Sequence, residues 1–182
     1  MFSAALYSLT VVFLAEMGDK TQLLALSFAG KYRGRDIMLG ILLATVLNHG
    51  LAVAVGSMAA SYLQGPWFTY AVALLFVGFG VWTLFPDKDA ESKPKEGHAV
   101  VVVAVAFFFA EMGDKTQLAT AGLAAAHPYP LAVLTGTTLG MLGADGLAVA
   151  LGEELYRRIP AKIVRHLAAG LFFVSGIWYA IR

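Results

Sequence analysis

The sequence contains no cysteine and few charged residues, and both shortages narrow the classes of protein to which it can belong. Without cysteine there are no disulfides, no thiolate metal sites and no thiol redox chemistry. Only 14% of the 182 residues are charged, whereas a soluble domain has about a quarter. A net charge of +1 without a long basic tract gives no support for nucleic-acid binding. No phosphate-binding glycine loop is present, so ATP is not a driving force within this chain.

What the sequence has in abundance is apolar residues, and they are gathered in long runs. Hydrophobic residues make up 59% of the chain, and about 20 in succession are enough to cross a bilayer as a helix. We therefore expect an all-α membrane protein with six transmembrane helices, at roughly 3–28, 37–61, 67–85, 98–125, 131–152 and 163–181. The Trp and Tyr residues near the ends of the third and sixth segments are expected to contact lipid as interfacial anchors.

The basic residues predict how the helices are oriented. Ten Lys or Arg residues lie in or beside the first, third and fifth connections between the predicted helices, and the second and fourth connections contain none. Positive loops favour the cytoplasmic side, so both termini should lie on the non-cytoplasmic side. The N-terminus has no positive n-region and reads as a retained helix, not a cleaved signal. These features predict a multi-pass protein of the cell inner membrane.

The chain carries an internal repeat. AEMGDKTQL occurs at 15–23 and again, identically, at 110–118, and GLAVAVG at 50–56 is followed by GLAVALG at 146–152. We therefore divide the chain into a three-helix repeat at 1–85, a polar cytoplasmic linker at 86–97 and a second three-helix repeat at 98–182. An odd number of spans per repeat inverts the second copy, as in secondary transporters. The alternative is an ancestral duplication that was kept only for helix packing. It explains well why the GLAVAVG and GLAVALG segments match, but it does not explain why the charged AEMGDKTQL segments match.

The repeated motif has the chemistry of an ion site. On a helix, Glu16, Asp19 and Lys20 project to one side, and Lys20 is expected to pair with Glu16 when the site is empty. Gly18 allows another backbone to approach or permits a local break in the helix. Thr21 and Gln22 add neutral oxygens. The second copy offers the same arrangement with Glu111, Asp114, Lys115, Thr116 and Gln117. We expect both lysines to have supporting roles. We expect the glutamate, aspartate, threonine and glutamine of each copy to be metal ligands.

The depth of the two copies suggests why they are charged. Some twelve apolar residues precede each glutamate, which places the carboxylates near mid-bilayer at about 1.5 Å per residue, where ionisable groups are kept for function by default. Two-fold pseudosymmetry would bring four carboxylates to one point, an oxygen cage for Mn²⁺, Ca²⁺ or Mg²⁺. Because paired carboxylates repel one another, we expect proton uptake as the metal leaves. The alternative is a salt-bridge network that only holds helices together.

Other residues within the predicted spans are open to two interpretations. Aligning the glycine motifs places His49 opposite Asp145, with Asn48 beside it. These residues could extend the cage or form a proton relay, or they could make a packing hydrogen bond. Gly136 and Gly140 form a small-xxx-small step and predict close helix packing.

The doubled pattern resembles the signature E-x-G-D-K-[ST] of the family of manganese and calcium cation–proton exchangers, which includes bacterial manganese exporters and their Golgi and chloroplast relatives. Both copies match in full, and the resemblance covers the whole chain. It implies export of Mn²⁺ from the cytoplasm in exchange for protons, with the four acidic residues as ligands. No cofactor is implied, since Mn²⁺ or Ca²⁺ is the transported substrate.

Several alternatives follow from the same residues. A Ca²⁺/H⁺ exchanger would use the same site, and a sodium-coupled version is conceivable. A cation channel could use the carboxylates as an acidic ring, although the inverted repeat favours a carrier whose halves rock about a fixed site. An intramembrane enzyme would need a positioned nucleophile, which nothing suggests, so we predict that the protein is not an enzyme. A bundle of six helices is small enough to pair with a second copy as a homodimer.

Overall fold

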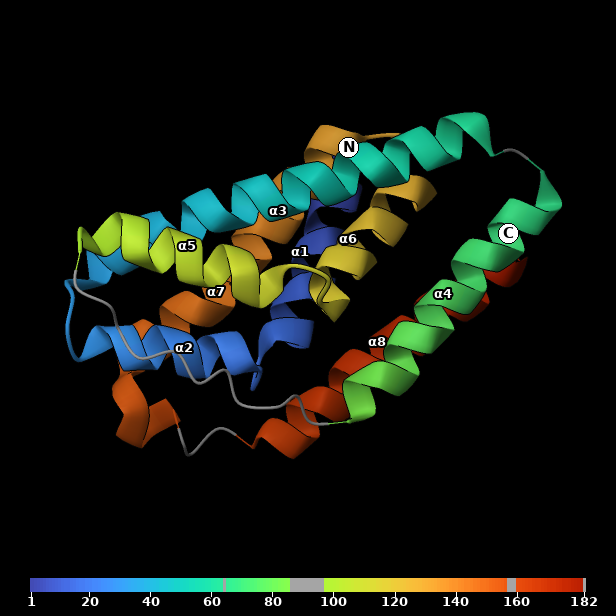
Figure 1. Ribbon diagram of the computed structural model, residues 1–182. Helices are drawn as coiled ribbons and strands as arrows, with labels where there is room; N and C mark the ends of the chain where they lie inside the picture. Colours follow the sequence, from blue (N-terminus) through green and yellow to red (C-terminus); the bar gives the residue numbers. More distant parts are fainter. Residues whose placement is uncertain (64, 86–96, 157–159, 182) are drawn as a thin grey trace.

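The computed structural model describes residues 1–63, 65–85, 97–156 and 160–181, which form eight α-helices and no strand (Figure 1). The predicted linker, apart from Gly97, and the basic residues Arg157 and Arg158 lie outside these residues. The helices are α1 (Phe2–Glu16), α2 (Lys20–Ala29), α3 (Gly34–Tyr62), α4 (Pro66–Leu84), α5 (Ala99–Glu111), α6 (Lys115–Ala126), α7 (Pro130–Tyr156) and α8 (Ala161–Ile181).

The all-helical membrane fold is confirmed, and two of the six predicted spans are each divided into two helices. Helices α3, α4, α8 and the part of α7 up to Gly152 are each long and apolar enough to cross a bilayer. The first predicted span is instead two helices, α1 and α2, bent by 75°. The fourth is likewise divided into α5 and α6. The described residues therefore supply four candidate spans, or five if the bent pair counts as one.

Both breaks arise from the repeated motif itself. Gly18 and Gly113 have positive φ angles of 81° and 77°, a conformation that costs other residues about 1–2 kcal/mol. Each glycine N–H is removed from the helical hydrogen-bond pattern and donates to a glutamine Oε1 one turn later. Gln22 accepts from Gly18 at 2.6 Å, and Gln117 accepts from Gly113 at 2.7 Å. Glycine and glutamine at this spacing thus create the same local break twice.

Glycines also allow the long helices to approach one another closely. A Cβ atom at Gly136 on α7 would lie 2.2 Å from the carbonyl oxygen of Ala5 on α1. A Cβ atom at Gly40 on α3 would lie 2.9 Å from the carbonyl oxygen of Val100 on α5. Helix α1 therefore packs on α7 as α5 packs on α3. The predicted packing role of Gly136 is confirmed, and so is that of Gly140, which meets α1.

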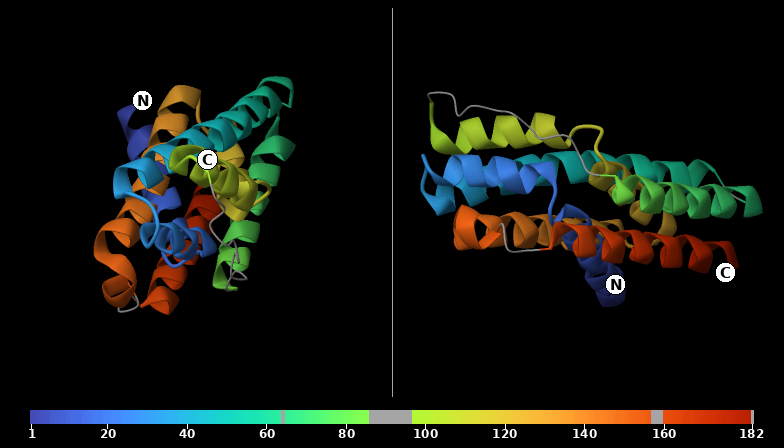
Figure 2. Two further views of the ribbon diagram at one scale, coloured as in Figure 1. Left: turned by 60° about the vertical axis from the view of Figure 1, so that its left-hand side comes forward. Right: turned by 90° about the horizontal axis from the view of Figure 1, so that it is seen from below.

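Two buried apolar clusters lie within the bundle. Cluster 1 combines residues of α1, α3, α4, α6, α7 and α8: Val11, Ala15, Val53, Val72, Phe76, Phe79, Ala119, Leu123, Ala124, Val133 and Phe172. Cluster 2 combines residues of α1, α2, α3, α5 and α7: Val12, Leu24, Ala25, Phe28, Ile37, Ile41, Ala44, Val103, Phe107 and Met141. Helices α4 and α8 lie side by side as a pair (Figures 1 and 2) and contribute buried residues only to cluster 1.

The outer surface of α3 is apolar along much of its length. Leu43, Leu47, Leu51 and Val55 recur at every fourth position and are 52–64% exposed. A continuous exposed stripe of this kind is typical of a surface that faces lipid. The membrane assignment therefore rests on side-chain exposure as well as on hydropathy.

Candidate ion-binding site

The two helix breaks meet inside the molecule through reciprocal ion pairs. Lys20 Nζ lies 2.8 Å from Asp114 Oδ2, and Lys115 Nζ lies 2.8 Å from Asp19 Oδ1. Each lysine therefore pairs with the aspartate of the other motif copy. Except for Lys20, whose side chain is 19% exposed, these side chains are almost completely buried. The two charged clusters, 95 positions apart in the sequence, come together as predicted.

The predicted pairing of Lys20 with Glu16 is wrong, and the reason is the break. Glu16 is the last residue of α1, whereas Asp19 is the N-cap of α2 with an extended backbone. Glu111 and Asp114 occupy the same positions at the end of α5 and the start of α6. The acidic residues of one copy therefore do not share one helix face, and the spacing rule for a continuous helix does not apply.

Glu16 and Glu111 are the two motif carboxylates that take no part in the ion pairs between Lys20, Asp114, Lys115 and Asp19. Both are buried. The Thr21 hydroxyl donates to Glu16 Oε2 at 2.8 Å, and the Thr116 hydroxyl donates to Glu111 Oε2 at 3.0 Å. The second oxygen of each glutamate, Oε1, has no hydrogen-bond partner among the described residues. The two glutamates are close enough to interact electrostatically. Buried carboxylate oxygens without a partner are costly, so these two atoms point to a ligand that neutralises them.

The glutamines and Asn48 brace the breaks in this structure. Because their Oε1 atoms accept from the glycines, Gln22 and Gln117 do not offer these oxygens to an ion. The Gln22 amide donates to the carbonyl oxygen of Ala144 on α7 at 2.5 Å. The Gln117 amide lies 3.4 Å from the carbonyl oxygen of Asn48 on α3, and Asn48 Nδ2 donates to the carbonyl oxygen of Phe108 at 3.0 Å. Each break is thus tied to a long helix of the other repeat.

His49 and Asp145 are buried and make no hydrogen bond, to each other or to any other described residue. The alternative of a packing hydrogen bond between them is therefore wrong. Asp145 lies within electrostatic range of both Glu16 and Glu111. The structure thus adds a third uncompensated acidic group beside the two glutamates.

The predicted cage of four converging carboxylates is not assembled. In the part of the chain that the structure describes, no three His, Asp or Glu side chains have the arrangement of a formed metal site. The physical reason is that the lysines neutralise Asp19 and Asp114. This exchange of partners between the copies was missed from the sequence, where spacing gives contacts only within one segment.

A charged centre buried between broken helices of a membrane protein is typical of secondary ion transporters. The particular family is shown by sequence comparison. Residues 4–91 and 99–182 match the family described as "Divalent cation/proton antiporter GDT1", and the chain belongs to this family. It is a family of transporters and not of enzymes, as predicted, and its metal is a transported substrate and not a cofactor.

Relatives span almost the whole chain. A protein of Vibrio cholerae named "Putative manganese exporter" is 40% identical over 180 residues, covering 97% of this chain and 90% of its own. GDT1-like protein 5 of Arabidopsis thaliana is 29% identical over 93% of this chain and 92% of its own. Protein PAM71-homolog, chloroplastic, of the same plant is 31% identical over 91% of this chain and 55% of its own. No solved structure matches the chain significantly.

Proposed function

We propose that this protein exports Mn²⁺ from the cytoplasm in exchange for protons. The observation that carries the proposal is the pair of buried Oε1 atoms of Glu16 and Glu111, which have no hydrogen-bond partner among the described residues. The family membership supports exchange of a divalent cation for protons, and the name of the Vibrio cholerae relative supports manganese as the cation.

The charges of the site suggest how metal and protons exchange. The pairs Lys20–Asp114 and Lys115–Asp19 are neutral in themselves. Glu16 and Glu111 then carry two negative charges that burial makes costly. Either one divalent cation or two protons neutralises them. Metal leaving the site is therefore replaced by protons, and Asp145 is available as a further proton acceptor or ligand.

Oxygen ligands of this kind suit a hard divalent cation. Glu16 and Glu111 would bind first. Asp19 and Asp114 would join them when the incoming cation displaces the lysine ammonium groups. The hydroxyl oxygens of Thr21 and Thr116 lie beside the glutamates, whereas Gln22 and Gln117 would have to release the glycine N–H groups before they could bind metal.

The proposed architecture is two inverted three-helix repeats, 1–85 and 98–182, with each broken helix pair crossing the membrane once. Its support is the reciprocity of the contacts. The Gln22 amide contacts the carbonyl oxygen of Ala144, and the Gln117 amide contacts the carbonyl oxygen of Asn48. Gln117 is the equivalent of Gln22, 95 positions later, and Ala144 is the equivalent of Asn48, 96 positions later. The distribution of basic residues supports an orientation with both termini on the non-cytoplasmic side.

The test is transport in proteoliposomes. Vesicles containing the purified protein are given Mn²⁺, Ca²⁺ or Mg²⁺ separately, with and without a pH gradient. We expect the strongest flux with Mn²⁺ and acceleration by an opposing proton gradient. Glu16→Gln and Glu111→Gln should abolish flux while the protein remains in the membrane. Asp36→Asn, which changes a partly exposed carboxylate that pairs with its neighbour Arg35, is the matched control and should transport normally.

Three outcomes would contradict the proposal. Flux that is indifferent to pH would favour a channel. Preference for Ca²⁺ over Mn²⁺ would favour a Ca²⁺/H⁺ exchanger. Failure of the two glutamine variants to insert in the membrane would favour a purely structural role for the glutamates.

A further inference from the structure

The helix pair α4–α8 packs on only one end of the remaining bundle. It contacts α1 and α6 extensively, whereas the described residues show no comparable contact with α2 or α5 (Figure 1). Helices α1 and α6 lie on one side of the two breaks, and α2 and α5 lie on the other. Among the described residues, α4–α8 therefore covers the α1/α6 side of the ion site and not the α2/α5 side.

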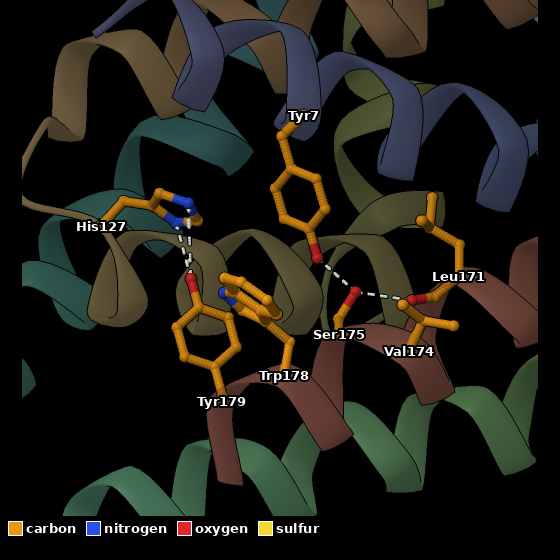
Figure 3. A pocket seen from close by; sticks show the side chains of 7 residues that line it. All are labelled: Tyr7, His127, Leu171, Val174, Ser175, Trp178 and Tyr179. Carbon is orange, nitrogen blue, oxygen red and sulfur yellow. Dashed lines mark hydrogen bonds between the residues drawn. The ribbon is translucent and has the colours of Figure 1, made fainter. Parts of the chain in front are cut away.

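Polar contacts connect α8 to α1 and to the residue after α6 at the covered end. The Tyr7 hydroxyl on α1 donates to Ser175 Oγ on α8. The Tyr179 hydroxyl on α8 lies 3.2 Å from Nδ1 of His127, the residue that follows α6. Figure 3 shows these side chains around a pocket of about 320 Å³ between α1, α6 and α8. Tyr179 is therefore not the lipid anchor that the sequence predicted, because its hydroxyl joins two helices.

Helices α4 and α8 are themselves equivalent in sequence. Residues 96 positions apart coincide at Ala73 and Ala169, Phe76 and Phe172, Gly80 and Gly176, and Trp82 and Trp178. The two helices cross where glycine leaves room: a Cβ atom at Gly176 would lie 2.8 Å from the carbonyl oxygen of Ala73, and one at Gly80 would lie 2.7 Å from the Phe173 ring. Helix α4 of the first repeat and helix α8 of the second are therefore equivalent, and together they form one pair.

Apolar residues that are buried at the α1/α6 end have counterparts in the other repeat at the α2/α5 end, and these counterparts are less buried. On the covered side, four positions are buried in cluster 1: Val11, Ala15, Val53 and Ala124. Their counterparts in the other repeat are only partly buried, against cluster 2: Ala106, Ala110, Val149 and Ala29. Matching surfaces therefore exist at both ends of the bundle, and α4–α8 lies on one of them.

We propose that α4–α8 is the moving element of the transporter and docks alternately on α1/α6 and on α2/α5. If the two repeats rocked as halves, the boundary between the fixed and moving parts would lie between the repeats. Here the moving part instead takes one helix from each repeat. This inference rests on the proposed function. With the predicted orientation, α4–α8 lies at the non-cytoplasmic end of the bundle in this structure, and docking on α2/α5 would bring it to the cytoplasmic end.

The repeat identifies the contacts of the second state. Tyr7–Ser175 corresponds to Val102–Phe79, and His127–Tyr179 corresponds to Tyr32–Thr83. Tyr32 and Val102 are both partly buried beside cluster 2. The Thr83 hydroxyl is buried and has no hydrogen-bond partner among the described residues. When α4–α8 moves to α2/α5, Tyr32 and Thr83 become neighbours.

Crosslinking tests the proposal cleanly, because the chain has no cysteine of its own. The paired variants are Tyr7→Cys/Ser175→Cys for the present state and Tyr32→Cys/Thr83→Cys for the second, with each single variant as its control. Membranes are treated with a short, reducible, bifunctional thiol reagent, and linked peptides are measured by mass spectrometry. Both pairs should link, and either link should stop Mn²⁺ flux until it is reduced.

A further substitution shifts the balance between the states. Tyr179→Phe removes one hydrogen bond from the covered end, so the yield of the Tyr32→Cys/Thr83→Cys link should rise about fivefold. Leu167→Ala, an exposed position on the same helix, should leave the yield unchanged. If Tyr32→Cys/Thr83→Cys does not fold, Phe79→Cys/Val102→Cys probes the same state.

The proposal is overturned if neither pair of the second state links under any condition, or if the Tyr7–Ser175 link forms fully without slowing flux. Peptide linking is measured independently of transport. A protein that links both pairs but carries no metal would therefore refute the proposed function and leave the motion standing.

Discussion

The ammonium group of Lys115, at the start of α6, lies 2.8 Å from Oδ1 of Asp19, at the start of α2. The pair joins the two copies of one motif, and the reciprocal pair Lys20–Asp114 does the same in the opposite sense. These bonds make each helix break dependent on the other for its charge balance. They also occupy two of the four carboxylates that the proposed metal requires.

The first prediction concerns this ion pair. Asp19→Asn or Lys115→Met alone removes one member of a buried ion pair, which should cost about 3–5 kcal/mol of stability. The double variant removes both charges and should recover most of that loss, but it should not transport Mn²⁺, because Asp19 is lost as a ligand. Thermal unfolding of the detergent-solubilised protein and flux in vesicles measure the two effects. If both single variants are as stable as the wild type, the pair is not a structural bond.

A second prediction separates the effect of the backbone conformation at the helix break from the effect of steric contacts. Gly113 has a φ of 77°, and a Cβ atom there would meet nothing within 4 Å. Gly113→Ala should therefore destabilise the protein by about 1–2 kcal/mol through backbone strain alone. Gly78→Ala is the matched control, since it also has open space but no positive φ, and should be neutral or stabilising. Equal unfolding temperatures for the two variants would show that the break is not held in this conformation.

The third prediction concerns Asp145, which is buried beside the glutamates without a hydrogen-bond partner. Asp145→Asn removes a group that is costly to bury in its charged form, so the protein should become more stable while Mn²⁺ flux falls. Leu147→Asn, on the same helix but 38% exposed, provides the control for introducing an amide on α7. Unfolding temperature and initial transport rate are the measurements. Unchanged flux would remove Asp145 from the ion pathway.

Much of the site could be predicted from the sequence, because the information lies in the repeat. Identical charged motifs in two apolar segments indicate that the two copies meet, and the structure brings Asp19 next to Lys115 and Lys20 next to Asp114. The packing role of Gly136 could be predicted from its spacing to Gly140, since small residues four apart on a helix allow close approach.

The helix breaks could not be predicted from hydropathy. The residues flanking Gly18 and Gly113 are apolar enough on both sides to read as one span, and a glycine within a helix is not by itself a break. The decisive feature is the hydrogen bond from each glycine N–H to the glutamine four residues later. Once the helix is broken, contacts inferred from helical spacing, such as Lys20 with Glu16, no longer hold.

The shortness of α5 has a consequence for how the protein is made. This helix has 13 residues, too few to cross a bilayer alone, and it leads directly to Asp114 and Lys115. The ion pairs that the structure describes for these two residues are with Asp19 and Lys20 of the first half of the chain, which leaves the ribosome earlier. We therefore expect the two ion pairs between the motif copies to form only after the second half of the chain has been synthesised.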